Sequence, residues 1–272
     1  MNPYVLTTIL PFVLAGILVA VLVQYLSPIA RDIGLVDRPN ERKQHEKEIP
    51  LVGGITILAG FYLSLFLVPF GLGPFRYLLF AIALLVIVGV FDDHQDISPL
   101  IKFGMQIVAA LILIADGAVV TAVGDVFNWQ DGNLQGLGYL SKPLTILAIV
   151  GLINAYNFID GHDGLSASML LLSLLVLVYI CGINDEWKMQ YFLLLYLFSV
   201  MIFLFFNLPF SLVKSRQIFL GDAGSMMFGL IMIYVLIDLA ERPVPALKAT
   251  CAPWIVGLPL LDMLAVILKR LR

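Results

Sequence analysis

Aspartates occupy three short polar breaks between the long apolar runs of this 272-residue chain. Carboxylates are rare at or near a bilayer unless they pair, bind a cation or take part in chemistry. If all three breaks face one side of a membrane, their carboxylates form one acidic site that suits a divalent cation. The residues are Asp92, Asp93 and Asp96 in the first break, Asp160 and Asp163 in the second, and Asp222 in the third.

The first break, Phe-Asp-Asp-His-Gln-Asp-Ile-Ser, places its carboxylates at helical spacing. Asp92 and Asp93 precede Asp96 by four and three residues, so a helix end here puts at least two carboxylates on one face. Like charges this close repel, and a bound cation is the simplest compensation. Oxygen-only ligands favour Mg²⁺ or Mn²⁺ over zinc. The alternative is a solvated loop that only marks a helix end.

The second break combines two asparagines with two aspartates. Asn154 and Asn157 lie about one helical turn apart at the end of an apolar run, where they can hydrogen-bond a polar ligand. Asp160 and Asp163 are each followed by glycine, which predicts a tight turn that presents both carboxylates. The alternative, a plain reverse turn, needs only one glycine and no paired asparagines.

The third break, Phe-Leu-Gly-Asp-Ala-Gly-Ser, starts at Phe219 and opens a new apolar run. Asp222 resembles an N-cap with Ser225 at the N3 position, which is the structural alternative to a site. The same geometry points backbone N–H groups and the positive end of a helix dipole toward an anion such as phosphate. Capping and metal binding can coexist, so this motif alone leaves both open.

A basic break between residues 27 and 50 carries a second candidate for phosphate binding. Arg42, Lys43 or Lys47 can contact a phosphate group, and Gly53 and Gly54 just beyond allow close backbone approach. The alternative is that these charges only hold the loop on the cytoplasmic side.

The composition excludes a water-soluble protein. Hydrophobic residues make up 61% of the chain and charged residues 13%, with a mean hydropathy of +0.99, whereas soluble domains carry about 25% charged residues. We therefore predict an all-α, polytopic helical bundle that forms a single domain over residues 1–272, with about nine transmembrane helices. Gly and Asn-Asp turn chemistry at 116–143 predicts a small periplasmic β-hairpin. The helices are expected at 4–26, 51–70, 77–91, 100–115, 144–157, 165–182, 190–206, 225–240 and 249–268.

The distribution of lysine and arginine predicts the orientation, because cytoplasmic loops carry an excess of positive charge. The breaks on one side hold eleven of the 16 Lys and Arg residues, and those on the other side hold five. The side whose breaks hold eleven Lys and Arg residues is expected to be cytoplasmic, with the N-terminus outside and the C-terminus inside. All three aspartate breaks then face the cytoplasm.

Together these stretches resemble the polyprenyl-phosphate N-acetylhexosamine-1-phosphate transferases. Five motifs appear in the family's order and spacing across essentially the whole chain. They are Gly-Leu-Val-Asp-Arg-Pro-Asn-Glu-Arg-Lys, Phe-Asp-Asp-His-Gln-Asp, Asn-Ala-Tyr-Asn-Phe-Ile-Asp-Gly-His-Asp-Gly, Leu-Gly-Asp-Ala-Gly-Ser and Pro-Leu-Leu-Asp-Met. The resemblance implies transfer of N-acetylglucosamine 1-phosphate from UDP-N-acetylglucosamine, or a related UDP-N-acetylaminosugar, to undecaprenyl phosphate. It also implies release of UMP, an Mg²⁺ cofactor that Mn²⁺ can replace, and a bacterial inner membrane location. This reaction starts O-antigen or enterobacterial common antigen synthesis. No nucleic-acid partner is expected, and the oligomeric state stays open, a homodimer included.

By the same resemblance, each motif acquires a role. Asp222 looks like the Mg²⁺ ligand, with Asp93 as a second ligand, and Asp92 and Asp93 look like the catalytic pair. The residues that look like the nucleotide-sugar pocket are Asn157, Asp160 and Asp163, with Phe219 near the uracil and Lys43 or Lys47 on a phosphate. The family continues into a further loop with a histidine-rich motif, whereas this chain stops at Arg272, so we expect a truncated sequence.

Two other classes of function stay open from the sequence. An intramembrane prenyltransferase also uses an aspartate-rich DDxxD motif with Mg²⁺, and it would release pyrophosphate instead of UMP. A cation transporter would place its carboxylates near the middle of the bilayer in broken helices.

Overall fold

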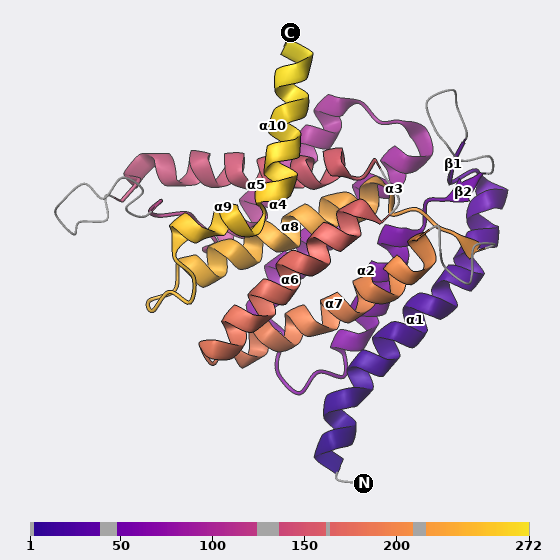
Figure 1. Ribbon diagram of the computed structural model, residues 1–272, viewed down its shortest axis with the longest axis horizontal. Helices are drawn as coiled ribbons and strands as arrows, with labels where there is room; N and C mark the ends of the chain where they lie inside the picture. The colour runs from indigo at the N-terminus through magenta and orange to yellow at the C-terminus, as the bar shows by residue number, and fades with distance from the viewer. Residues whose placement is uncertain (1–2, 39–47, 124–135, 162–163, 209–215, 272) are drawn as a thin grey trace.

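A computed structural model describes residues 3–38, 48–123, 136–161, 164–208 and 216–271. Within these residues the chain is a bundle of helices with a single two-stranded sheet, which confirms the all-α expectation (Figure 1). The helices are α1 (Pro3–Ile33), α2 (Gly53–Leu65), α3 (Arg76–Gln95), α4 (Pro99–Ala115), α5 (Ser141–Ile159), α6 (Leu165–Ile183), α7 (Trp187–Asn207), α8 (Gly221–Ala240), α9 (Ala252–Ile255) and α10 (Gly257–Leu271). Short 3₁₀ turns lie at η1 (Gly73–Phe75), η2 (Gly138–Leu140) and η4 (Ala249–Cys251).

Helix α8 is the centre of the bundle. Its apolar window is 83% buried, compared with 28–50% for the other helices of membrane-spanning length, and it packs against α2, α3 and α5. A helix that is apolar on all sides has no polar face to expose and is therefore buried. Small residues let the neighbours approach closely: a Cβ on Gly229 would lie 2.4 Å from the Cα of Ile153 in α5.

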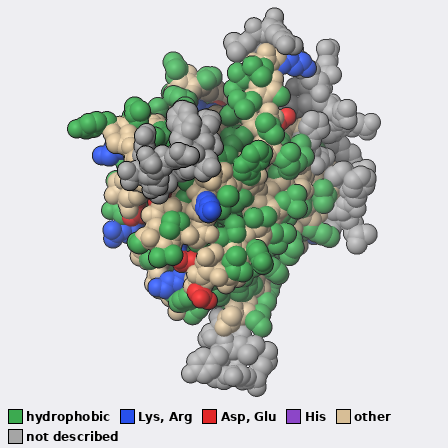
Figure 2. Space-filling view, turned by 60° about the vertical axis from the view of Figure 1, so that its left-hand side comes forward, with side chains coloured by type: hydrophobic (Ala, Val, Ile, Leu, Met, Phe, Trp, Pro, Cys, Tyr) green, Lys and Arg blue, Asp and Glu red, His purple; other side chains and the backbone are tan. Residues whose placement is uncertain are grey.

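The outer surface of the bundle is apolar, as expected for a protein that faces lipid. Large hydrophobic side chains are exposed on many helices, such as Phe80 of α3 at 63% and Tyr179 of α6 at 68%. Figure 2 shows hydrophobic side chains over most of the described part of one face, with few charged side chains between them. The chain is thus a membrane protein.

The nine membrane crossings that the sequence predicts are confirmed only in part. Six helices of the described residues are long and apolar enough to cross a membrane, and a bent pair would make seven. The other two predicted spans, 51–70 and 100–115, correspond to the shorter apolar helices α2 and α4, with 13 and 17 residues. A helix of 13 residues is about 20 Å long, less than the thickness of the hydrocarbon core.

The last apolar run is broken where the sequence analysis expects one helix over 249–268. The segments Ala249–Ile255 and Gly257–Arg270 meet at 71°. Pro253, Gly257 and Pro259 surround the break, and such residues interrupt the hydrogen-bond ladder of a helix. As a result α10 projects from the bundle, with the C-terminus at its tip and the N-terminus at the opposite end of the view (Figure 1).

The two-stranded sheet lies where no strand was expected. Strand β1 (Val36–Asp37) pairs antiparallel with β2 (Ile49–Pro50), just before α2. The hairpin predicted at 116–143 falls largely on residues 124–135, which lie outside the described residues; residues 118–123 are not in a strand.

At the C-terminal end of α8, an ionic cluster joins two segments of the chain. Arg242 donates hydrogen bonds to Asp238 at 3.0 and 2.5 Å, and it forms an ion pair with Glu186 before α7. Burial disfavours the charged form, but the hydrogen bonds to the two carboxylates outweigh it and raise the pKa of Arg242. This cluster ties the α6–α7 turn to the end of α8.

Candidate active site

The last turn of α3 caps the first turn of α8. One carboxylate oxygen of Asp93 accepts a hydrogen bond from the backbone N–H of Asp222 at 2.8 Å, and the other lies 3.4 Å from the N of Ala223. Because the first N–H groups of a helix have no partner within it, a carboxylate from another helix can satisfy them. From the sequence, an N-cap role for Asp222 was left open as the alternative to a site. The structure does not support that alternative: Leu220 is the N-cap residue, Asp222 lies within the first turn, and the capping carboxylate comes from Asp93.

Glycines allow this close approach of backbone to backbone. A Cβ on Gly89 of α3 would lie 2.3 Å from the Cα of Ala223, and one on Gly54 of α2 would lie 2.4 Å from the N of Gly224. Gly221 adopts a positive φ of 72°, and a Cβ there would meet the Asp93 carboxylate at 2.4 Å. Both neighbouring helices therefore fix the position of the Asp222 end of α8.

Asn157, near the end of α5, completes the meeting point. Its side-chain amide donates to Oδ1 of Asp222 at 2.8 Å and to the hydroxyl of Ser225 at 2.9 Å. The structure thus brings together residues from three of the predicted motifs, which are separated by about 65 residues or more in the chain. The expected convergence at one end of α8 is thus confirmed for carboxylates of the first and third breaks, while the second break contributes Asn157.

Lys102 joins two of the carboxylates. Its ammonium group lies 2.5 Å from Oδ2 of Asp92 and forms an ion pair with Oδ2 of Asp222. All three side chains are largely buried, with exposures of 20% for Lys102, 12% for Asp92 and 30% for Asp222. The structure therefore places Asp92, rather than Asp93, with its carboxylate facing Asp222.

A second polar contact holds α4 against α5. Asn154 donates to the side-chain oxygen of Gln106 at 2.7 Å and to the carbonyl of Val150 at 2.8 Å. Gln106 is buried and its amide lies 3.7 Å from the sulfur of Met226. Asn154, predicted to bind substrate, thus makes an interhelical contact one turn below Asn157.

The contact of Lys102 with two aspartates was not predicted from the sequence, where Lys102 counted only as a charge that sets the orientation. A signal was present, because Lys102 and Gln106 are four residues apart in an apolar helix and share one face. A charge or amide inside such a helix needs a polar partner. The partners are Asp92 and Asp222 for Lys102, and Asn154 for Gln106.

The arrangement fits Mg²⁺. Within the residues that the structure describes, no three His, Cys, Asp or Glu side chains gather into a metal site. Mg²⁺ does not need such a set, since it is commonly held by one or two carboxylates and completes its octahedron with waters and substrate phosphates. Asp92 and Asp222 already direct their carboxylates at one positive charge, the ammonium of Lys102.

The other predicted site residues are placed only in part. The backbone of Phe219 pairs with the segment before α2: its N–H donates to Pro50 at 2.9 Å, and its carbonyl accepts from Gly53 at 2.9 Å. Asp160 ends α5 at the C-cap position. Lys43, Lys47 and Asp163 lie outside the described residues.

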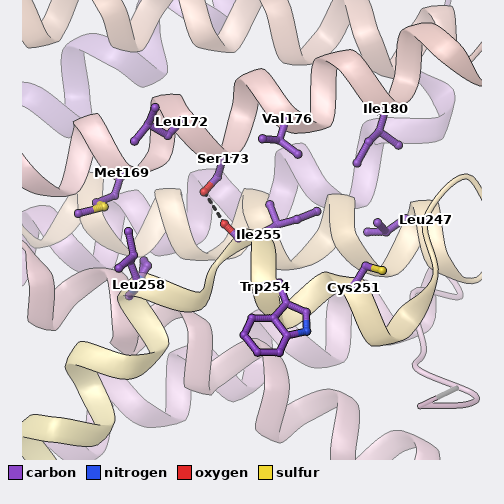
Figure 3. A pocket seen from close by; sticks show the side chains of 11 residues that line it. Met169, Leu172, Ser173, Val176, Ile180, Leu247, Cys251, Trp254, Ile255 and Leu258 are labelled. Carbon is purple, nitrogen blue, oxygen red and sulfur yellow. Dashed lines mark hydrogen bonds between the residues drawn. The ribbon is translucent and has the colours of Figure 1, made fainter. Parts of the chain in front are cut away.

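An apolar groove opens between α6 and the broken pair α9 and α10 (Figure 3). Its volume is about 520 Å³, and the hydroxyl of Ser173 donates to the carbonyl of Ile255 across it at 2.8 Å. The indole of Trp254, which is 85% exposed, is among the side chains that line it. One end of the groove lies at Met169, about one helical turn after the start of α6. Helix α6 itself begins directly after the loop that contains Asp160.

Comparison with known proteins is consistent with these features. The model of the family described as glycosyl transferase family 4 matches residues 75–240, a range that includes Asp92, Asp93, Asn157 and Asp222. The chain is similar to proteins named undecaprenyl-phosphate alpha-N-acetylglucosaminyl 1-phosphate transferase. The protein from Escherichia coli K12 is 30% identical over 245 residues, which cover 90% of this chain and 66% of the relative. The protein from Yersinia pestis is 31% identical over the same shares, and that from Haemophilus influenzae Rd is 32% identical over 91% of this chain and 69% of the relative.

The chain spans about two thirds of the length of these relatives, at 66% of the Escherichia coli protein. The family match covers more than half of this chain and contains Asp92, Asp93, Asn157 and Asp222, which meet at the start of α8. The chain therefore belongs to glycosyl transferase family 4.

Proposed function

We propose that this chain catalyses transfer of N-acetylglucosamine 1-phosphate from UDP-N-acetylglucosamine to undecaprenyl phosphate. The observation that carries the proposal is the meeting of Asp92, Asp93, Asn157 and Asp222 at the buried start of α8. The names of the relatives agree with the donor group and the lipid acceptor.

In the proposed reaction, an oxygen of the lipid phosphate attacks the phosphorus that carries the sugar. A new phosphorus–oxygen bond forms, the bond to the bridging oxygen of the diphosphate breaks, and UMP leaves with that oxygen and its electron pair. The acceptor phosphate is already mostly ionised at neutral pH, since its second pKa is about 6. The protein's main task is therefore to align two anions and neutralise their charge.

The residues at the start of α8 suit this task. Asp222 and Asp92 would hold Mg²⁺, in place of the pair Asp222 and Asp93 expected from the resemblance, because the Asp93 carboxylate accepts from the start of α8. The ion would neutralise charge on the diphosphate and on the departing UMP. Asn157 orients Asp222 through its hydrogen bond to Oδ1, and Asp93 fixes the helix that carries Asp222. For the nucleotide-sugar pocket we propose Lys43, Lys47, Asp160, Asp163 and Phe219.

The groove between α6 and α9 suits the lipid acceptor. Its lining is almost entirely hydrophobic, and it follows α6 from Met169 to Ile180 (Figure 3). An isoprenoid chain gains free energy from burial there, about 25 cal/mol per Å² of apolar surface. Because Met169 lies close to the Asp160 turn, a lipid in this groove can present its phosphate at the end of the bundle that bears the aspartates.

We place the site on the cytoplasmic side of a bacterial inner membrane. The excess of lysine and arginine on the breaks of that side supports the orientation, and the donor nucleotide sugar is a cytoplasmic compound. The product would be the lipid-linked pyrophosphoryl sugar that starts O-antigen or enterobacterial common antigen synthesis.

Product analysis tests the proposal. The purified chain is incubated with Mg²⁺, undecaprenyl phosphate and each of several labelled UDP-sugars, with the Escherichia coli relative as positive control. We expect UMP and a labelled lipid, formed fastest with UDP-N-acetylglucosamine. In a parallel incubation with an allylic diphosphate, release of pyrophosphate would indicate a prenyltransferase instead. Metal flux without nucleotide sugar, measured in proteoliposomes, would indicate a transporter.

A further inference from the structure

Lys102 occupies the place between two carboxylates where a bridging cation would lie. Oδ2 of Asp92 and Oδ2 of Asp222 both contact its ammonium nitrogen. The remaining oxygen of Asp222 accepts a hydrogen bond from Asn157 at 2.8 Å. Lys102 therefore already holds one oxygen of each aspartate, and Asn157 holds the other oxygen of Asp222.

A divalent cation and this ammonium group cannot hold the same oxygens at once. An ammonium group and a metal ion on these atoms would be only a few Å apart, and two positive charges that close repel strongly in a partly buried site. The aspartates are anchored by their helices: Asp92 lies in the last turn of α3, and Asp222 in the first turn of α8. Lysine has a flexible four-carbon stem and can move its charge away.

We infer that Lys102 is a resident counter-ion that stabilises the Asp92–Asp222 pair without metal and must leave when the divalent cation binds. The inference rests on the proposed function in one respect, namely that these two aspartates are the cation's ligands. Lys102 then sets the affinity of the site for metal by competition. It also keeps two like charges from repelling each other, and so from loosening the contact between α3 and α8, before the cation arrives.

Metal binding measured directly tests this inference without relying on turnover. The probe is Mn²⁺, whose free concentration is followed by electron paramagnetic resonance during titration of the purified protein in nanodiscs. Lys102→Met keeps the apolar stem and removes the charge. We expect it to bind Mn²⁺ at least about tenfold more tightly than the wild type, which is about 1.4 kcal/mol. Without metal, its thermal unfolding midpoint should be lower than that of the wild type. Lys102→Arg keeps the charge and should bind Mn²⁺ with near wild-type affinity.

The inference is overturned if Lys102→Met binds Mn²⁺ no more tightly than the wild type. If Asp222→Asn abolishes binding in the same experiment, the proposed metal site stays intact. Unchanged Mn²⁺ binding by Asp222→Asn overturns the metal site of the proposed function itself.

A labelling experiment on the wild type covers the case in which Lys102→Met does not fold. Acetic anhydride should modify Lys102 faster at saturating Mn²⁺ than without metal, because the released amine is no longer paired. The exposed Lys142 and Lys188 serve as internal references, and their labelling should not change. Equal or slower labelling of Lys102 with Mn²⁺ contradicts displacement.

Discussion

Replacing Gly89 by alanine should push α3 away from the start of α8 and separate the two parts of the site. The added Cβ would lie 2.3 Å from the Cα and 2.4 Å from the N of Ala223, whereas ordinary contact begins at 3.4 Å. Both atoms are backbone of a buried helix, so neither can rotate away. The helices must separate by about 1 Å, and misplacement on that scale can lower turnover about 100-fold. Overpacking of this kind typically costs about 1–3 kcal/mol of stability.

The assay is UMP release per folded protein, together with the thermal unfolding midpoint. Gly151→Ala in α5 is the matched control, because nothing lies within 4 Å of a Cβ at that position. It should keep wild-type turnover and gain about 0.5–1 kcal/mol, the usual advantage of alanine over glycine in a helix. Wild-type turnover and midpoint in Gly89→Ala would refute the reasoning, since α3 and α8 could then move apart without loss.

Two further substitutions separate positioning from metal binding. Asp93→Asn should lose about 1 kcal/mol of stability and much of the turnover, because an amide has one oxygen and cannot accept from the N–H groups of both Asp222 and Ala223. Mn²⁺ titration of this variant should give near wild-type affinity. A loss of affinity as large as that of Asp222→Asn would instead make Asp93 a metal ligand. Arg242→Met removes the ion pairs with Glu186 and Asp238 at the far end of α8, so the thermal midpoint should fall by an amount that corresponds to about 1–3 kcal/mol. Mn²⁺ affinity in Arg242→Met should not change, and a change would show that the two ends of α8 are coupled.

The apolar runs predicted most of the helices, because length and hydropathy alone distinguish a membrane helix from a loop. The predicted helix 165–182 corresponds to Leu165–Ile183, and the predicted helix 100–115 to Pro99–Ala115. Helix ends were less predictable where polar residues continue the helix. Asp92 and Asp93 were assigned to a break, but they lie in the last turn of α3, since the hydrogen bonds of Asp93 to α8 compensate for its charge.

The site was predictable as a meeting of distant motifs but not as a set of contacts. The types and spacing of Asp92, Asn157 and Asp222 indicate shared chemistry, whereas the packing of Gly89 against Ala223 decides which carboxylate faces which. That packing depends on the relative positions of helices, which periodicity does not contain. The bend before α10 was missed for a related reason: glycine and prolines near residue 257 permit a break, but tertiary contacts determine its angle.

The most direct test of the central claim compares Asp222→Asn with Asp185→Asn in UMP release across a range of Mg²⁺ concentrations. Asp185 is an exposed carboxylate in the α6–α7 turn with φ of 58°, a conformation that asparagine adopts readily. If the start of α8 holds the catalytic cation, Asp222→Asn loses at least about 100-fold in turnover at every Mg²⁺ concentration, a loss typical of removing one key electrostatic contact. Asp185→Asn should match the wild type. Near-normal turnover of Asp222→Asn at both limiting and saturating Mg²⁺ would contradict the account.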